Sequence, residues 1–180
     1  MYKYFVHSFY TLVPPETWFA QHPEWFSLVN GRRTAENAQL CLSNPDLRDF
    51  VVQRVRQALR EAPEARIISV SQNDCFNPCE CANCKAMDEA QGSHAGSLLA
   101  FVNYVAEKIQ PEFPKVSVDT LAYQYTRKPP ATERPRPNVI VRLCSIECNF
   151  RETLDSPANV AFAADLYGWD QRADRLYIWD

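Results

Sequence analysis

Two acidic residues stand behind apolar runs of the sequence, where the end of a strand can present a carboxylate to a ligand. Asp74 follows the run Ile67–Val70 after three polar residues, and Glu147 follows the run Val139–Ile146. Most glycoside hydrolases use two carboxyl groups, one to protonate the leaving oxygen and one to act as base or nucleophile. We therefore expect Asp74 to be the general acid and Glu147 to be the base, the nucleophile or a hydrogen-bond partner of the substrate. In the alternative interpretation, each carboxylate caps a helix or binds a loop arginine.

Other polar and aromatic residues near the ends of expected strands are candidates for contacts to a sugar. Aromatic faces stack on the apolar faces of sugar rings, and an amide such as that of Asn73 can bind a hydroxyl or an N-acetyl group. The expected substrate-binding residues are His7, Asn73, Tyr123, Tyr125, Trp179 and Asp180. Asp180 is also a third candidate carboxylate. In the alternative interpretation about half of these side chains are structural, because strand residues alternate between two faces.

A cysteine cluster, Cys79-x-Cys81-x-x-Cys84, lies in a loop that we place at 75–84. Three thiolates so close in sequence can bind one structural zinc ion, with a fourth ligand from Cys75, Cys148 or a histidine. A disulfide with one spare thiol is the alternative if the parent protein is exported, and three free thiols are another. The total of seven cysteines is odd, so they cannot all be paired within one chain. We expect Cys41 and Cys144 to be small core residues, since their neighbours are apolar.

The pattern of apolar residues predicts strands and helices in alternation. We expect helices at 16–22, 45–62, 96–109 and 157–169, and strands at 4–10, 66–71, 116–125, 139–146 and 175–179. Such alternation predicts an α/β fold with a parallel sheet whose polar residues gather at the carboxyl ends of the strands. A complete (β/α) TIM barrel takes ~250 residues. We therefore predict that residues 1–180 form one partial barrel domain with about five parallel strands.

Composition narrows the partners that we expect. The formal net charge is -3, which argues against a nucleic-acid surface, whereas an aromatic content of 12% suits a carbohydrate ligand or a well-filled core. No apolar run reaches the ~20 residues of a membrane span, and the N-terminus does not resemble a signal peptide. The chain as given is therefore expected in the cytoplasm, unless it is part of a longer protein. Because an incomplete barrel has unpaired edges, we also expect self-association.

Seven sequence runs resemble the domain-of-unknown-function 4838 family. They are HPEWFSLVNGRR (22–33), LCLSNP (40–45), ISVSQND (68–74), CECANCKAMDE (79–89), LAYQYTRKPP (121–130), VRLCSIEC (141–148) and RLYIWD (175–180). The resemblance covers nearly the whole chain, although Cys75 stands where a polar residue is expected. It implies a glycoside-hydrolase-like TIM barrel, similar to α-glucuronidases and hexosaminidases, in large bacterial proteins of which many come from gut Bacteroidetes. It also implies that this chain is a middle-to-late segment of the barrel.

Overall fold

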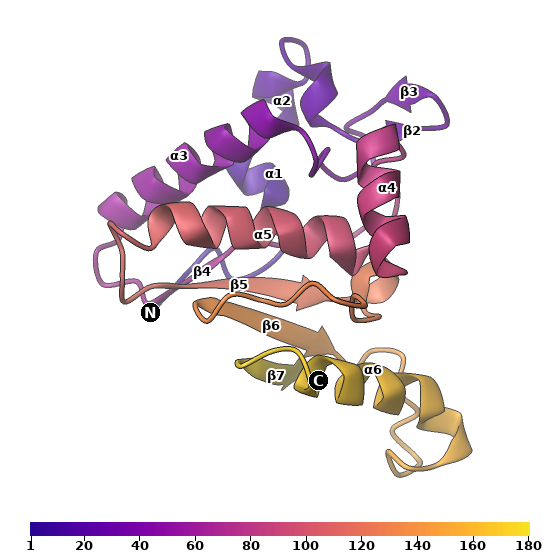
Figure 1. Ribbon diagram of the computed structural model, residues 1–180. Coiled ribbons are helices and arrows are strands. Elements are labelled where there is room, and N and C mark those ends of the chain that lie inside the picture. The colour runs from indigo at the N-terminus through magenta and orange to yellow at the C-terminus, as the bar shows by residue number, and fades with distance from the viewer.

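A five-stranded parallel sheet forms the centre of the protein, as a computed structural model of residues 1–180 shows (Figure 1). Its strands are β1 (Tyr2–Lys3), β4 (Ile67–Ser69), β5 (Ser117–Ala122), β6 (Val139–Cys144) and β7 (Leu176–Trp179). They lie side by side in that order, and every neighbouring pair is parallel. The strands thus lie in the sheet in the same order as in the sequence, as in a barrel. In a doubly wound sheet, the strand order reverses part-way. The expected α/β class and five parallel strands are confirmed, and the sheet is open rather than closed into a barrel.

Helices pack on one face of this sheet. The two long ones are α3 (Pro45–Glu61) and α5 (Ala95–Ile109); α5 lies directly on β5 and β6, and α3 packs against α5 (Figure 1). The helix α6 (Val160–Asp170) lies at the β6–β7 end. Apolar side chains fill the space between the layers, and those of Ile68, Val118 and Val141 are fully buried. This burial supplies the main driving force for the fold.

The start of α3 follows the sequence pattern. Asn44 caps the helix, because its side-chain oxygen accepts a hydrogen bond from the Leu47 amide at 2.9 Å. Pro45 occupies the first helical position, where no backbone donor is needed. The predicted helix at 45–62 is confirmed. The helix predicted at 96–109 also forms, and the one predicted at 157–169 is divided into the 3-10 turn η3 (Pro157–Asn159) and α6.

The sheet face opposite α5 carries a buried ion pair. Arg142 Nη2 lies 3.0 Å from Asp119 Oδ2, and the two side chains are 2% and 0% exposed. The Tyr177 hydroxyl donates to the same Asp119 oxygen at 3.2 Å. The Arg142 guanidinium also lies over the rings of Phe5 and Trp179, at 4.5 and 5.2 Å from their centroids. A charge needs such partners when it is buried this deeply.

The predicted strand at 4–10 is wrong. Only β1 is extended, and Tyr4 and His7 then adopt φ angles of 54° and 52°, which a strand cannot contain. The chain turns there into the short helix α1 (Phe9–Leu12), which places Phe9 in the core. Tertiary burial of Phe9 thus outweighs the β propensity of this aromatic stretch. Instead of the helix expected at 16–22, the short helix α2 (Pro15–Trp18) and the 3-10 turn η1 (Pro23–Trp25) form.

The cysteine-rich region contains two elements. The hairpin of β2 (Leu28–Val29) and β3 (Arg32–Arg33) turns at Asn30-Gly31, and both turn residues have positive φ. The helix α4 (Ala82–Gln91) was not expected, because we predicted a loop at 75–84 and no helix between that loop and residue 96. It ends at Gly92, which adopts the left-handed conformation with φ of 60°.

Two expected strands end earlier than the sequence pattern. β5 stops at Ala122 and is followed by the 3-10 turn η2 (Gln124–Thr126), whereas β6 stops at Cys144.

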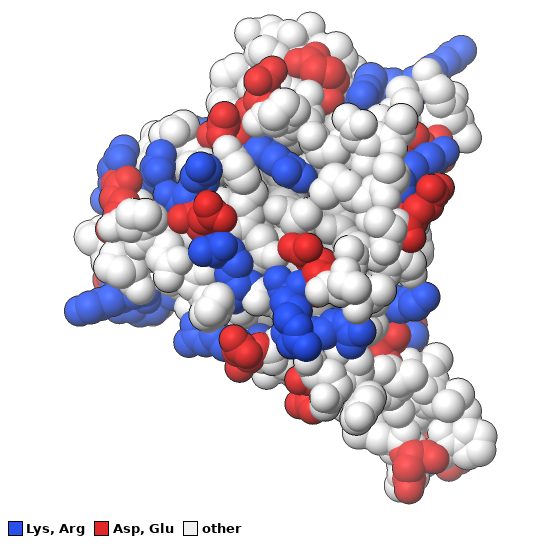
Figure 2. Space-filling model, viewed as in Figure 1, with Lys and Arg blue, Asp and Glu red and all other residues white.

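None of the helices has both the length and the apolar character to cross a membrane. On the helical face in Figure 2, basic and acidic side chains are interspersed, with ion pairs such as Arg60–Glu112 at 2.7 Å.

Candidate functional site

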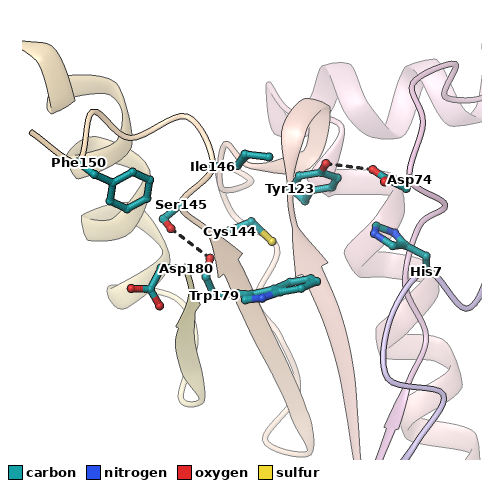
Figure 3. A pocket seen from close by; sticks show the side chains of 9 residues that line it. All are labelled: His7, Asp74, Tyr123, Cys144, Ser145, Ile146, Phe150, Trp179 and Asp180. Carbon is teal, nitrogen blue, oxygen red and sulfur yellow. Dashed lines mark hydrogen bonds between the residues drawn. The ribbon is translucent and has the colours of Figure 1, made fainter.

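A cavity of about 380 Å³ opens at the carboxyl ends of the strands (Figure 3). It is lined by His7, Asp74, Tyr123, Cys144, Ser145, Ile146, Phe150, Trp179 and Asp180. Segments that follow all five strands contribute to it, because the ends of parallel strands share one edge of the sheet. Five of the predicted site residues are therefore brought together in one place: His7, Asp74, Tyr123, Trp179 and Asp180.

Asp74 and Tyr123 form a polar contact on one wall of this cavity. The Tyr123 hydroxyl donates to Asp74 Oδ1 at 3.0 Å and accepts a hydrogen bond from Gln124 Nε2 at 2.9 Å. Burial, reinforced by the hydrogen bond to the Asp74 carboxylate, raises the pKa of Tyr123 to about 12. Tyr123 therefore remains a hydrogen-bond donor at neutral pH. No protein group binds Asp74 Oδ2, so this oxygen is available to a ligand.

His7 presents one nitrogen to the same cavity. Its Nδ1 lies 2.8 Å from the carbonyl oxygen of Gln72. A carbonyl only accepts, so the proton is on Nδ1, and Nε2 is the free acceptor in the neutral ring. The His7 ring lies 5.9 Å from that of Tyr123, on the Asp74 side of the cavity (Figure 3).

The opposite wall comes from β6 and β7. The Ser145 amide donates to the Trp179 carbonyl at 3.0 Å, and the Ser145 hydroxyl donates to the same oxygen at 3.2 Å. These bonds fix the Trp179 backbone, and its indole forms an aromatic wall that extends toward the His7 side, whereas the Asp180 carboxylate points the other way (Figure 3). Cys144 also lines this wall, but burial raises the pKa of its thiol to about 12. It is therefore protonated and not a nucleophile.

Asn73 lies outside the cavity and holds the chain in place. It is 8% exposed, its Oδ1 accepts from the Tyr10 amide at 3.3 Å, and its Nδ2 donates to the Ala38 carbonyl at 2.9 Å. These bonds use the amide that we expected to contact a sugar. The position of Asn73 next to Asp74 in the sequence did not reveal this structural role, because the hydrogen-bond partners of Asn73 come from other segments of the chain.

Tyr125 also lies outside the cavity. Its ring packs between Phe76 and His94, with centroid distances of 6.3 and 5.7 Å. The expectation assumed a strand through 116–125, in which Tyr123 and Tyr125 would share a face. Because β5 ends at Ala122 and Gln124 has a φ of 52°, the alternation stops before Tyr125.

Glu147 makes an ion pair and does not line the cavity. Its Oε2 lies 2.6 Å from Arg127 Nη1, and Arg127 Nε lies 2.6 Å from Asp165 Oδ2. The Glu147 side chain is 41% exposed. This arrangement is the structural alternative that the sequence left open, a carboxylate bound by a loop arginine.

A second group of reactive side chains is a cluster of four cysteines. The Sγ atoms of Cys41, Cys79, Cys81 and Cys84 all lie within 4.8 Å of one another, so the cluster can hold a metal ion. The fourth member is thus Cys41, neither a histidine nor one of the cysteines we suggested, and its expected role as a simple core residue is corrected. The Cys75 thiol instead donates to the Ala38 carbonyl at 3.5 Å. All seven cysteines are free, and the Cys41–Cys81 sulfur separation of 3.6 Å exceeds a disulfide bond.

The cysteine cluster favours negative charge. The pKa of Cys41 is lowered, because the thiols of Cys79 and Cys84 donate hydrogen bonds to its sulfur. The same contact with Cys41 raises the pKa of Cys79 to about 11. Cys81 is the N-cap of α4, where the helix dipole favours a thiolate, whereas the hydrogen bond to Cys41 raises the pKa of Cys84. The hydrogen bonds within the cluster therefore favour the thiolate of Cys41 over those of Cys79 and Cys84.

Comparison with known protein families agrees with the resemblance seen in the sequence. The model of the family described as "Domain of unknown function (DUF4838)" matches residues 1–180. The chain belongs to the DUF4838 family. A comparison with curated proteins gives no match. The family description names no activity, so the function of this DUF4838 chain has to be argued from its cavity and its cysteine cluster.

Several residues of the cavity and of the cysteine cluster in this DUF4838 chain were not predicted from the sequence. Ser145, Ile146 and Phe150 line the cavity, and Cys41 completes the cysteine cluster. Ser145 follows a strand just as Asp74 does, so its position was a usable signal. Cys41 gave no local signal, because it lies far from the other three cysteines in sequence.

Proposed function

We propose that this DUF4838 chain forms the sugar-binding part of a TIM-barrel domain that resembles glycoside hydrolases and acts on a poly- or oligosaccharide. The observation that carries the proposal is that Asp74 and Trp179 line one cavity of about 380 Å³ at the carboxyl ends of parallel strands. A volume of that order suits a small ligand. Trp179 offers an aromatic wall for a sugar ring, and the polar groups of Asp74, Tyr123 and His7 suit its hydroxyls.

Asp74 is the residue to which we assign the general acid. Tyr123 occupies Oδ1, so Oδ2 is the oxygen that would transfer a proton to the leaving group. The hydrogen bond from Tyr123 orients the Asp74 carboxyl group, which a base or nucleophile needs as well.

The second carboxylate is either Asp180 or Glu147. Asp180 lines the same cavity as Asp74, whereas Glu147 is held by Arg127. We therefore favour Asp180 as the partner of Asp74. Glu147 would take this role only if the substrate displaced Arg127.

The test is hydrolysis of a panel of aryl glycosides, including uronides and N-acetylhexosaminides, by the parent protein and by Asp74→Asn. A general acid matters most when the leaving group is poor. Asp74→Asn should therefore slow substrates with poor leaving groups by roughly 100-fold or more and activated aryl glycosides much less. Equal losses on all substrates would instead make Asp74 the nucleophile or base. Asp155→Asn is the matched control, since Asp155 is exposed and does not line the cavity.

A second candidate function is sugar binding without hydrolysis. The ion pair of Glu147 with Arg127 favours it, because that carboxylate is already neutralised. Titration of the tryptophan fluorescence of the parent protein and of Trp179→Phe with the same sugars separates the two functions. Binding without release of the aryl group would support the second function, and a folded protein that neither binds nor cleaves would refute both.

We also propose that the cysteine cluster binds a zinc ion in a structural role. Four sulfur ligands leave no open position for substrate, which is typical of structural rather than catalytic zinc. When bound, the ion would supply folding free energy and no chemistry.

Finally, we propose that the chain associates through its sheet edges. β1 and β7 each have one unpaired edge, whose backbone groups can pair with another chain. Sedimentation should reveal dimers that Ile178→Lys, on the exposed strand β7, dissociates. A monomer at all concentrations would contradict this proposal.

A further inference from the structure

The cysteine cluster has the dimensions of a metal–tetrathiolate centre. A zinc–sulfur distance of about 2.3 Å in a tetrahedron gives sulfur separations of about 3.8 Å. The Cys41–Cys81 separation is 3.6 Å, between residues 40 positions apart in sequence. Cys79 and Cys84 are 6% and 2% exposed, and Cys41 is 3% exposed. Buried soft ligands of this kind favour zinc over magnesium or calcium.

The surroundings of the cluster suit its negative charge. Four thiolates around a divalent ion carry a net charge of about −2. The Leu28 amide donates to Cys79 Sγ at 3.4 Å, and Arg33 Nη1 donates to the same sulfur at 3.6 Å. The N-terminus of α4 adds a positive dipole end at Cys81. Outer partners of this kind orient the ligands and tune metal affinity.

The cluster joins three segments of the chain. Cys41 belongs to the segment before α3, and its amide donates to the Trp25 carbonyl at 2.8 Å. The β2–β3 hairpin is attached to the cysteine loop by the bond from the Glu80 amide to the Leu28 carbonyl, at 2.8 Å. A metal ion at the cluster would therefore fasten the segment containing Cys41 to the loop that leads from Asp74.

Gln39 connects this segment to the cavity. Its Nε2 donates to the carbonyls of Asn73 and Cys75, at 3.0 and 2.7 Å, and its Oε1 accepts from the Asn73 amide at 2.9 Å. Gln39 thus holds the backbone on both sides of Asp74. Gln39 and Cys41 are two positions apart, at most about 7 Å along the chain. The side chain of Asp74 has one protein partner, Tyr123, and the Gln39 bonds hold the backbone that carries this side chain.

We propose that a zinc ion bound by Cys41, Cys79, Cys81 and Cys84 fixes the segment containing Gln39 and thereby positions Asp74 in the cavity. The inference rests on the structural zinc proposed above and concerns the position of Asp74, whichever sugar the cavity takes. Asp74 is the group that touches the ligand, and the cluster acts through Gln39 as a positioning device.

The first measurement is zinc content and affinity of the full chain, purified under reducing conditions. One zinc per chain is expected, and Cys41→Ser should weaken binding by more than the roughly 100-fold that loss of an outer partner causes. Cys75→Ser is the matched control, because Cys75 lies in the same loop but outside the cluster; it should bind zinc normally. A parent protein that binds no zinc, or Cys75→Ser that loses it, would overturn the zinc centre.

The second measurement is hydrogen exchange of the parent protein with zinc, after chelation and after zinc is restored. Removal of zinc should speed exchange at 37–41 and 73–78 by at least tenfold, reversibly, and leave α6 unchanged. Gln39→Ala should bind zinc but exchange rapidly at 73–78 in its presence, which separates the connection from metal binding. Zinc binding with unchanged exchange at 73–78 would overturn the positioning role. Both measurements use no sugar, so failure of the hydrolase proposal would affect neither.

Discussion

Arg142→Met should destabilise the protein strongly, because it leaves a buried carboxylate without its charged partner. The side chains of Asp119 and Arg142 are 0% and 2% exposed and lie 3.0 Å apart. After the substitution only the Tyr177 hydroxyl would still donate to Asp119 Oδ2, and Oδ1 has no hydrogen-bond partner at all. Burial already raises the pKa of Asp119, against the attraction of Arg142.

The expected loss follows from this geometry. Removing one partner of a buried ion pair costs roughly 3–5 kcal/mol. Independently, an unpaired Asp119 that stays neutral holds a proton that the unfolded chain has released, which costs ~1.36 kcal/mol for each pH unit above the ordinary aspartate pKa of ~3.9, or about 4 kcal/mol near pH 7. A raised carboxyl pKa lowers the free energy of unfolding only when the pH lies above the ordinary aspartate pKa. The loss should therefore fall to about 1.5 kcal/mol near pH 5.

Urea unfolding followed by circular dichroism measures the free energy of unfolding near pH 5 and near pH 7. The double variant Asp119→Asn with Arg142→Met removes both charges and should regain most of the stability at pH ~7. Asp155→Asn, on the exposed surface, should change the free energy of unfolding by less than about 0.5 kcal/mol. A loss for Arg142→Met below about 1 kcal/mol, or one independent of pH, would refute the reasoning.

Three further predictions follow from other contacts. Asn44→Ala should lower the free energy of unfolding by about 1 kcal/mol, because the Leu47 amide loses its cap. Asn44→Ser should keep most of this stability, since serine can also cap a helix. Equal free energies of unfolding for the two variants, measured by chemical unfolding, would argue against the cap. Gly168→Ala should destabilise by about 1–3 kcal/mol, since the added methyl would lie 2.5 Å from Pro129 Cγ; a higher melting temperature, the usual effect of alanine in a helix, would contradict this. The hydrogen bond to Asp88, at 2.7 Å, raises the pKa of His94, so the stability it contributes is fully present below the ordinary histidine pKa and is lost as pH rises through the raised value. The melting-temperature advantage of the parent protein over His94→Gln should therefore shrink from about pH 6 to about pH 8, and an advantage that grows would contradict the assignment.

Local signals in the sequence were enough for the main elements of the fold. The alternation of apolar runs predicted the parallel sheet and the helix α3. The same pattern located Asp74, Tyr123 and Trp179 at strand ends, because parallel strands present their carboxyl ends at one edge. These features depend on residues close together in sequence, and sequence reasoning is strongest there.

Only the tertiary structure decided which side chains meet. Cys41 joins the cysteine cluster, and Arg127 takes Glu147 away from the cavity. Tyr125 is lost from the cavity because one residue with positive φ interrupts the strand alternation. Each outcome depends on packing between segments far apart along the chain. Such contacts leave no periodic trace in a single sequence, because their free energy comes from burial and geometry rather than from local propensity.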